Sequence, residues 1–227
     1  MFKHKTPIPT EADLNYVHTP APTILLHPNV AADKYYHLVM KEKLWKSWSG
    51  DSFGIKYLTD DGQEGDPFQV DVKGVVMTVR DKMILQDSQT GTPVAIMYKM
   101  FLKLQTTFKI YTFTANIPNQ KPSKQKHDGR DLYEWAECKD KFFSVQKTMK
   151  TVDGVEYVMD GIGKVFAAHR QMRISRNGKP CMHAVEKTLG IFKGNQWELK
   201  IGPGIDPALM VAFMAVMDEM NEEGQSG

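Results

Sequence analysis

The sequence is poor in cysteine, and this scarcity excludes one class of fold. Cys138 and Cys181 are the only cysteines in 227 residues, too few and too far apart to form a disulfide framework. A chain of this length can build a sizeable hydrophobic core and does not need such cross-links. We therefore expect both thiols to be reduced, as they are in proteins of reducing compartments.

Long apolar segments are also missing. No apolar stretch follows the N-terminus as in a secretory signal, and no Asn-X-Ser/Thr sequon occurs. The apolar run 208–217 is bounded by Asp206 and Asp218. As a helix this run extends about 15 Å, half of a hydrocarbon core that is about 30 Å thick. We expect no transmembrane span and a cytoplasmic location.

Charge of one sign is not in excess. The sequence has 29 Lys and Arg against 27 Asp and Glu, which gives a formal net charge of +2. A nearly neutral chain has no global field that attracts nucleic acid or a membrane. No nucleic-acid partner is expected, and any electrostatic role requires a local patch.

Motifs for catalysis, metal binding and cofactor binding are absent as well. The seven histidines have no partner at metal-ligand spacing, and there is no Cys-X-X-Cys, P-loop, dinucleotide fingerprint or Gly-X-Ser-X-Gly elbow. The acidic stretch 60–66 lacks the ligand order of an EF-hand loop, which favours a hairpin turn. We expect no cofactor and no enzymatic activity, although a site assembled from distant strands leaves no local motif.

What is present is a succession of short β-type segments between residues 35 and 201. Runs of β-branched and aromatic residues are separated by turn residues about every eight to twelve positions, which is typical of a sandwich or barrel. The same order of hairpins occurs twice, with separations of 87 to 92 residues: Asp61-Gly62 and Asp153-Gly154, Met83–Leu85 and Met172–Ile174, Gly91 and Gly178, Phe108 and Trp197. This period indicates two copies of one all-β unit; the alternative is chance, because hairpin meanders resemble one another.

A hydrophobic helix is predicted over residues 206–223. Asp206 suits the N-cap, Pro207 suits the first helical position, and Gly224 lies beyond the end. Every face of this helix is apolar, so protein must surround it. The residues expected at the centre of the core are Leu209, Met210, Phe213, Met214, Val216 and Met217. We predict an all-β fold in which a closed barrel, built from two pseudo-repeats, encloses the C-terminal helix and leaves no exposed sheet edge.

The N-terminal segment differs from the rest in its proline content. Five prolines precede residue 30: Pro7, Pro9, Pro20, Pro22 and Pro28. Because proline lacks an amide donor and disfavours helix in the preceding residue, residues 1–34 are predicted to form an extended arm, part of which lies on the barrel. The barrel domain is expected over residues 35–222.

Several segments resemble the LURP-one-related family: Met40–Lys43 with Gly50–Phe53, Val79–Asp87 with Gly91–Val94, and Gly204–Ala212 with Asp218–Met220. The resemblance implies a roughly twelve-stranded barrel threaded by the C-terminal helix, a fold shared with the Tubby C-terminal domain and the phospholipid scramblases. Tubby domains bind phosphoinositides at the inner face of the plasma membrane, and LURP-one-related proteins have links to plant defence signalling. The matching segments are structural, so the resemblance assigns no ligand-binding residue.

A basic loop between the two halves, residues 116–131, is the best candidate for a binding site. Its cations are Lys121, Lys124, Lys126 and Arg130. Each cation near an anionic leaflet contributes about 1 kcal/mol, so anionic phospholipid headgroups are the candidate partner. The alternative is a solvated connecting loop. A second set mixes cations with aromatics, which suits either a membrane interface or an amphipathic strand edge: Lys41, Lys43, Lys46, Trp45 and Trp48.

These observations favour a non-enzymatic module that binds phospholipid or phosphoinositide at the cytosolic membrane surface in signalling. The alternative is an adaptor for a protein partner, in defence or stress signalling, without lipid affinity. Scramblase-like lipid translocation is a third reading, but it requires a cysteine cluster for palmitoylation or a membrane anchor, and the sequence has neither.

Overall fold

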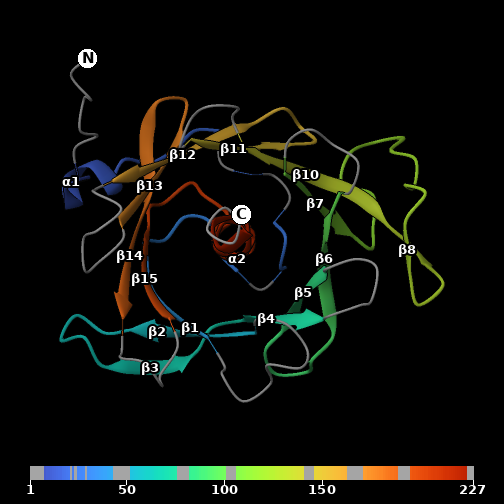
Figure 1. The fold of residues 1–227 in the computed structure, drawn as a ribbon. Coiled ribbons are helices and arrows are strands. Elements are labelled where there is room, and N and C mark those ends of the chain that lie inside the picture. The colour runs from blue at the N-terminus through green and yellow to red at the C-terminus, as the bar shows by residue number, and fades with distance from the viewer. Residues whose placement is uncertain are drawn as a thin grey trace.

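The chain forms a closed antiparallel barrel around its C-terminal helix (Figure 1). The computed structural model describes residues 8–20, 22, 25–28, 30–42, 52–75, 82–100, 106–140, 146–162, 171–188 and 195–223. Within these residues there are two helices, α1 (Glu11–Leu14) and α2 (Pro207–Glu223), and the following strands: β1 (Tyr36–Glu42), β2 (Phe53–Leu58), β3 (Glu64–Pro67), β4 (Val70–Val75), β5 (Lys82–Asp87), β6 (Pro93–Lys99), β7 (Thr107–Thr112), β8 (Lys126–His127), β9 (Arg130–Asp131), β10 (Tyr133–Asp140), β11 (Lys147–Thr151), β12 (Glu156–Ile162), β13 (Gln171–Arg176), β14 (Lys179–Thr188) and β15 (Asn195–Ile201).

The first strand closes the barrel. β1 pairs with β15 on one side, where Tyr36 lies opposite Ile201, and with β2 on the other, where Leu38 lies opposite Tyr57. Apart from this closing pair of β1 with β15, each barrel strand lies beside the next barrel strand in the sequence. The described residues therefore form an up-and-down meander of twelve strands, which does not include β3, β8 and β9. β3 pairs with β2 alone and, with β4, forms the return side of the first hairpin. The predicted all-β closed barrel is confirmed.

The two predicted pseudo-repeats correspond to two runs of six barrel strands, β1 to β7 without β3, and β10 to β15. A β-bulge follows Leu85 in the β5–β6 hairpin and another follows Ile174 in the β13–β14 hairpin, 89 residues later. In each hairpin a proline, Pro93 or Pro180, is the first partner beyond the bulge. Proline cannot donate to the strand ladder, so its place beside a bulge recurs for a physical reason.

The helix α2 fills the barrel, and Figure 1 shows it end-on inside the ring of strands. All six residues predicted to occupy the core centre, and their neighbours from Ala208 to Met217, are at most 3% exposed. A helix that is apolar on every face needs this surrounding sheet to keep it from water. At the start of α2, the carboxylate of Asp206 accepts hydrogen bonds from the backbone N–H groups of Ala208 and Leu209, at 2.9 and 3.1 Å. Asp206 is therefore the predicted N-cap.

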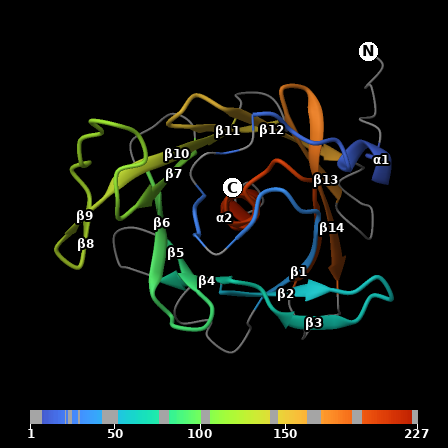
Figure 2. The same ribbon diagram turned by 180° about the vertical axis from the view of Figure 1, so that it is seen from behind.

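The N-terminal arm crosses the barrel opening at which α2 begins (Figure 2). The prediction of an extended arm is wrong at Glu11–Leu14, which form one helical turn. A capping box explains this turn, because the Thr10 hydroxyl accepts from the Asp13 N–H while the Asp13 carboxylate accepts from the Thr10 N–H. Leu14 and Leu26 of the arm are buried, at 1% and 5% exposure, so the arm packs as part of the core.

Candidate functional site

The basic loop forms an ordered flap, which we define as residues 116–132. Asp128 and Gly129 both have positive φ, 50° and 75°, and make the two-residue turn of the β8–β9 hairpin. The two limbs of the flap are held together by the Ser123 N–H, which donates to the Leu132 carbonyl at 2.7 Å. The Gln120 side-chain amide extends this pairing by donating to the Glu134 carbonyl at 2.6 Å.

The inner side of the flap covers apolar residues on the outside of the barrel. Leu132 is fully buried in a second cluster, separate from the barrel interior, which contains Ile84, Ile96, Tyr98 and Tyr111. Phe113 packs against the same cluster. The flap therefore has its own hydrophobic contact with the barrel and is more than a solvated connecting loop.

The four predicted cations all lie on the flap and are exposed, but their surroundings differ. Lys126 forms an ion pair with Asp131 across the hairpin, at 3.1 Å. The Arg130 guanidinium lies 3.8 Å from the centre of the Phe113 ring. Lys121, Lys124 and Arg130 make no ion pair within the described residues. These three are the flap cations that remain available to an anionic partner.

His127 adds no charge to this set near neutral pH. Its side chain is 8% exposed. Burial lowers the pKa of the His127 imidazole, and the nearby Lys82 ammonium lowers it further. The neutral ring packs beside Phe113, with ring centres 6.0 Å apart.

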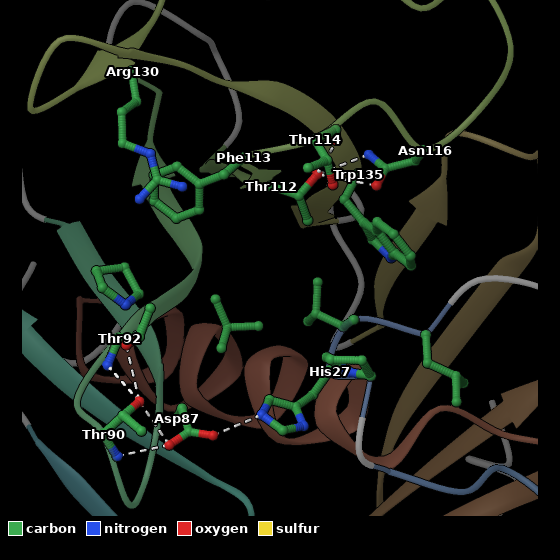
Figure 3. Close-up of a pocket in the computed structure, with 15 residues that line it drawn as sticks. His27, Asp87, Thr90, Thr92, Thr112, Phe113, Thr114, Asn116, Arg130 and Trp135 are labelled. Atoms are coloured by element: carbon green, nitrogen blue, oxygen red, sulfur yellow. Dashed lines mark hydrogen bonds and ion pairs between the residues drawn. The ribbon is translucent and has the colours of Figure 1, made fainter.

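A pocket of about 410 Å³ lies where the arm meets the barrel opening (Figure 3). Its lining comes from five places in the chain: arm residues 25–28, the β5–β6 turn with the start of β6, the end of β7 with the start of the flap, Arg130 of β9, and Trp135 of β10. Figure 3 shows Arg130 with Phe113 at one side of the pocket and Asp87 with Thr90 at the opposite side. The pocket thus has a cationic edge, and the flap forms part of its wall.

Asp87 fastens the arm to the β5–β6 turn. Its Oδ1 accepts from the backbone N–H groups of Gln89 and Thr90, at 3.0 and 2.7 Å, and from the Thr90 hydroxyl at 2.9 Å. Its Oδ2 lies 3.1 Å from His27 Nε2. These hydrogen bonds, led by the Thr90 backbone N–H, lower the pKa of Asp87 to about 2 against the opposing effect of burial. Asp87 is charged near neutral pH, but its oxygens are already bonded to protein donors.

Donors and acceptors also line the wall between the flap and β10. The Asn116 side-chain amide donates to the Thr112 hydroxyl at 2.8 Å, and both residues are buried. Trp135 is 7% exposed, and its indole Nε1–H is buried with no hydrogen-bond acceptor among the described residues. An indole N–H in a buried position normally has a partner. Trp135 lines the pocket, so this unused donor lies beside the pocket, behind the surface that water can reach.

In the part of the chain that the structure describes, no three His, Cys, Asp or Glu side chains are placed to hold a metal ion together. Cys138 and Cys181 are both free and buried, and burial raises the pKa of each thiol. What the lining offers chemically is the cation Arg130, the indole of Trp135, several threonine hydroxyl groups and a group of apolar side chains, with the Asp87 carboxylate already bonded to protein donors.

The second predicted set of cations and aromatics does not form a described site. Lys43, Trp45, Lys46 and Trp48 lie outside the described residues. Lys41 lies on β1, where it forms an ion pair with Glu64. Glu64 therefore neutralises the charge of Lys41 within the sheet.

Most pocket residues could not be found from the sequence. The chain separates His27 from Asp87 by 60 residues. Trp135 and Ala136 are consecutive and both buried, because the register of β10 against β7 shifts between Glu134 and Ala136. One local signal was present: Asp128-Gly129 between two short extended segments is typical of a two-residue hairpin turn. It predicts a hairpin inside the loop, although nothing local connects that hairpin to the arm.

A closed meander barrel filled by its own C-terminal helix defines the structural class of this protein. The sequence model of the LURP-one-related family matches residues 36–218, from the first barrel strand to the middle of α2. The chain therefore belongs to the LURP-one-related family. No curated protein matches it. None of the helices in the described residues has the length and apolar character needed to cross a membrane.

Proposed function

We propose that this protein is a non-enzymatic module that binds anionic phospholipid headgroups, phosphoinositides among them, at the cytosolic surface of a membrane in signalling. The observation that carries the proposal is the set of three cations, Lys121, Lys124 and Arg130, that are exposed on an ordered flap without an ion pair among the described residues. The Tubby-like fold expected for this family supports the same reading.

The magnitude is sufficient for reversible membrane association. Three cations at about 1 kcal/mol each give roughly 3 kcal/mol, or about a hundredfold enrichment at an anionic surface. Lys126 contributes less because Asp131 neutralises it. Since the flap is held by hydrogen bonds and apolar packing, little conformational entropy is lost when it meets the surface.

Vesicle co-sedimentation tests the proposal. The protein is expected to sediment with vesicles that contain phosphatidylserine or phosphatidylinositol bisphosphate. Less protein should sediment as salt rises from about 50 to about 300 mM, because the Debye length shortens and the surface charges are screened. The double substitution Lys121→Ala/Lys124→Ala should reduce binding by roughly 10- to 30-fold. A matched control, Lys73→Ala/Lys150→Ala, removes two exposed lysines from β4 and β11 that likewise form no ion pair among the described residues, and should leave binding nearly unchanged.

An adaptor function is the second candidate, and one observation favours it. Ile8, Tyr16 and Val17 of the arm are 55%, 41% and 58% exposed, although they are large apolar residues. Lys179 lies 3.7 Å from the centre of the Tyr16 ring. Exposed apolar side chains of this kind suit a protein partner. Absence of sedimentation with every vesicle composition would reject the lipid proposal and favour the adaptor.

A further inference from the structure

We infer that the pocket between the arm and the flap binds one small amphipathic anion, with an oxyacid group such as phosphate or carboxylate joined to a short apolar body. This inference goes beyond membrane association, because it concerns a pocket for a single molecule. It rests on the cavity, on the position of Arg130 and on the unused donor of Trp135.

Arg130 provides the site for the anionic group. Its guanidinium lies over the Phe113 ring, which orients the planar fork without using its N–H donors. No carboxylate among the described residues forms an ion pair with it. The one carboxylate in the pocket lining, that of Asp87, lies at the opposite side in Figure 3. An oxyacid group can therefore meet Arg130 without displacing a protein anion.

Trp135 indicates a second polar contact. A buried donor without an acceptor is unfavourable by about 1–3 kcal/mol relative to a satisfied one. Figure 3 shows the indole extending from β10 toward the arm segment that carries His27. A carbonyl, ether or ester oxygen of the ligand can accept from this buried N–H once the wall around the indole shifts.

An apolar part of the lining fits an apolar body. The apolar residues of the wall come from the arm, the start of β6 and the end of β7: Leu25, Leu26, Pro28, Pro93, Val94 and Phe113. The volume of about 410 Å³ lies within the usual range for small-molecule sites, about 300–1,000 Å³. Such sites combine apolar side chains with polar groups that fix the orientation of the ligand.

Isothermal titration calorimetry of the full chain with hexyl phosphate tests the site. One molecule of hexyl phosphate is expected to bind per chain. Inorganic phosphate lacks the apolar body and 1-hexanol lacks the anionic group, so each should bind at least about tenfold more weakly. Failure of hexyl phosphate to bind at millimolar concentration would overturn the inference. Inorganic phosphate binding as tightly as hexyl phosphate would overturn it too, because the apolar wall would then have no role.

Three variants locate the binding. Arg130→Ala should weaken hexyl phosphate binding about tenfold or more. Trp135→Phe, which keeps a ring but removes the N–H, should weaken the binding of dihexanoyl phosphatidic acid, whose ester carbonyls can accept from that N–H, about fivefold. Lys126→Ala removes a cation from the same hairpin but outside the pocket lining, and should bind like the parent. Because Arg130 is exposed, its substitution leaves the fold intact and the test stands even if Trp135→Phe is poorly folded. Unchanged binding by Arg130→Ala would reject the inference.

The ligand can come from a membrane or from solution, and two soluble probes distinguish the sources. Monomeric dihexanoyl phosphatidic acid has the ester carbonyls of a lipid, and hexyl phosphate does not. Tighter binding of the former assigns the pocket to a lipid, and tighter binding of the latter to a soluble phosphate ester. The variant Lys121→Ala/Lys124→Ala should keep its affinity for hexyl phosphate while its vesicle binding weakens, so failure of one proposal is distinguishable from failure of the other.

Discussion

The backbone N–H of Leu26 donates a 2.6 Å hydrogen bond to the carboxylate of Asp206, 180 residues away in the sequence. Asp206 is at once the N-cap of the central helix and the anchor of the N-terminal arm. One buried carboxylate therefore links the helix that fills the barrel to the segment that forms a wall of the pocket. Stability of the fold and integrity of the pocket are coupled through this group.

Asp206 should give the protein a measurable pH dependence of stability. Burial raises the pKa of Asp206 from 3.8 to about 6, although the N–H groups of Leu26, Leu209 and Ala208 oppose the shift. Between these two values the folded state holds a proton that the unfolded chain has released, so the contribution of this group to stability falls as pH rises from about 4 to about 6, by roughly 3 kcal/mol, and is constant above.

The measurement is the free energy of unfolding in urea at intervals from pH 4 to pH 8 for the parent and for Asp206→Asn. The variant should be less stable, because its amide cannot accept from the same three N–H groups, and its stability should fall less between pH 4 and pH 6. Asp128→Asn, at an exposed turn position, is the matched control. Parallel pH curves for the parent and Asp206→Asn would contradict the prediction.

Gly204 tests how closely the arm approaches the barrel. Its φ is 82°, and a Cβ built on it would lie 2.1 Å from the His18 carbonyl oxygen. Gly62 has nearly the same φ, 80°, but no atom within 4 Å of such a Cβ. Gly62→Ala should therefore lose about 1 kcal/mol for the backbone conformation alone, and Gly204→Ala about 2 kcal/mol or more beyond that. Equal losses of unfolding free energy would show that the arm yields easily.

The fold could be predicted because its signals are local. A helix that is apolar on every face must be enclosed, and the recurring turns define the strands that enclose it. The capping residue of that helix, Asp206, is recognisable for the same reason. The turn at Glu11–Leu14 was missed because the prolines of the arm outweighed Thr10 and Asp13, whose spacing is that of a capping box.

The site could be predicted only in part. The cations of the flap are visible as a group because they are close together in the sequence, but their unequal availability depends on Asp131 and Phe113. The pocket depends on contacts between distant segments. Trp135 interrupts the strand alternation at the register shift of β10, but the apolar pair Trp135-Ala136 does not by itself locate a pocket. Its significance follows from an unsatisfied N–H, which only the folded structure reveals.

The central helix should tolerate no buried charge. Phe213 and Val216 are both fully buried within the barrel, and neither has a polar partner that could neutralise an ammonium group. Phe213→Lys or Val216→Lys should abolish the cooperative unfolding transition that circular dichroism measures. An unpaired buried charge costs more than the free energy of about 5–15 kcal/mol that stabilises a typical domain. Phe213→Leu, an apolar control, should retain a cooperative transition. A lysine variant that melts like the parent would mean that α2 is dispensable to the core.

The flap should behave as part of the folded core, and a pair of apolar residues on it tests this. Leu132 is fully buried against the outer face of the barrel, whereas Ile117 on the same flap is 37% exposed. Leu132→Ala should lower the free energy of unfolding by about 2–4 kcal/mol, and Ile117→Ala by about 0.5 kcal/mol or less. Amide exchange adds a local measurement, since the Ser123 N–H donates to the Leu132 carbonyl and should be protected in the parent but not in Leu132→Ala. If Ser123 exchanges freely in the parent, the flap opens independently of the barrel, and the cations it carries meet a membrane as a flexible loop instead of a fixed surface.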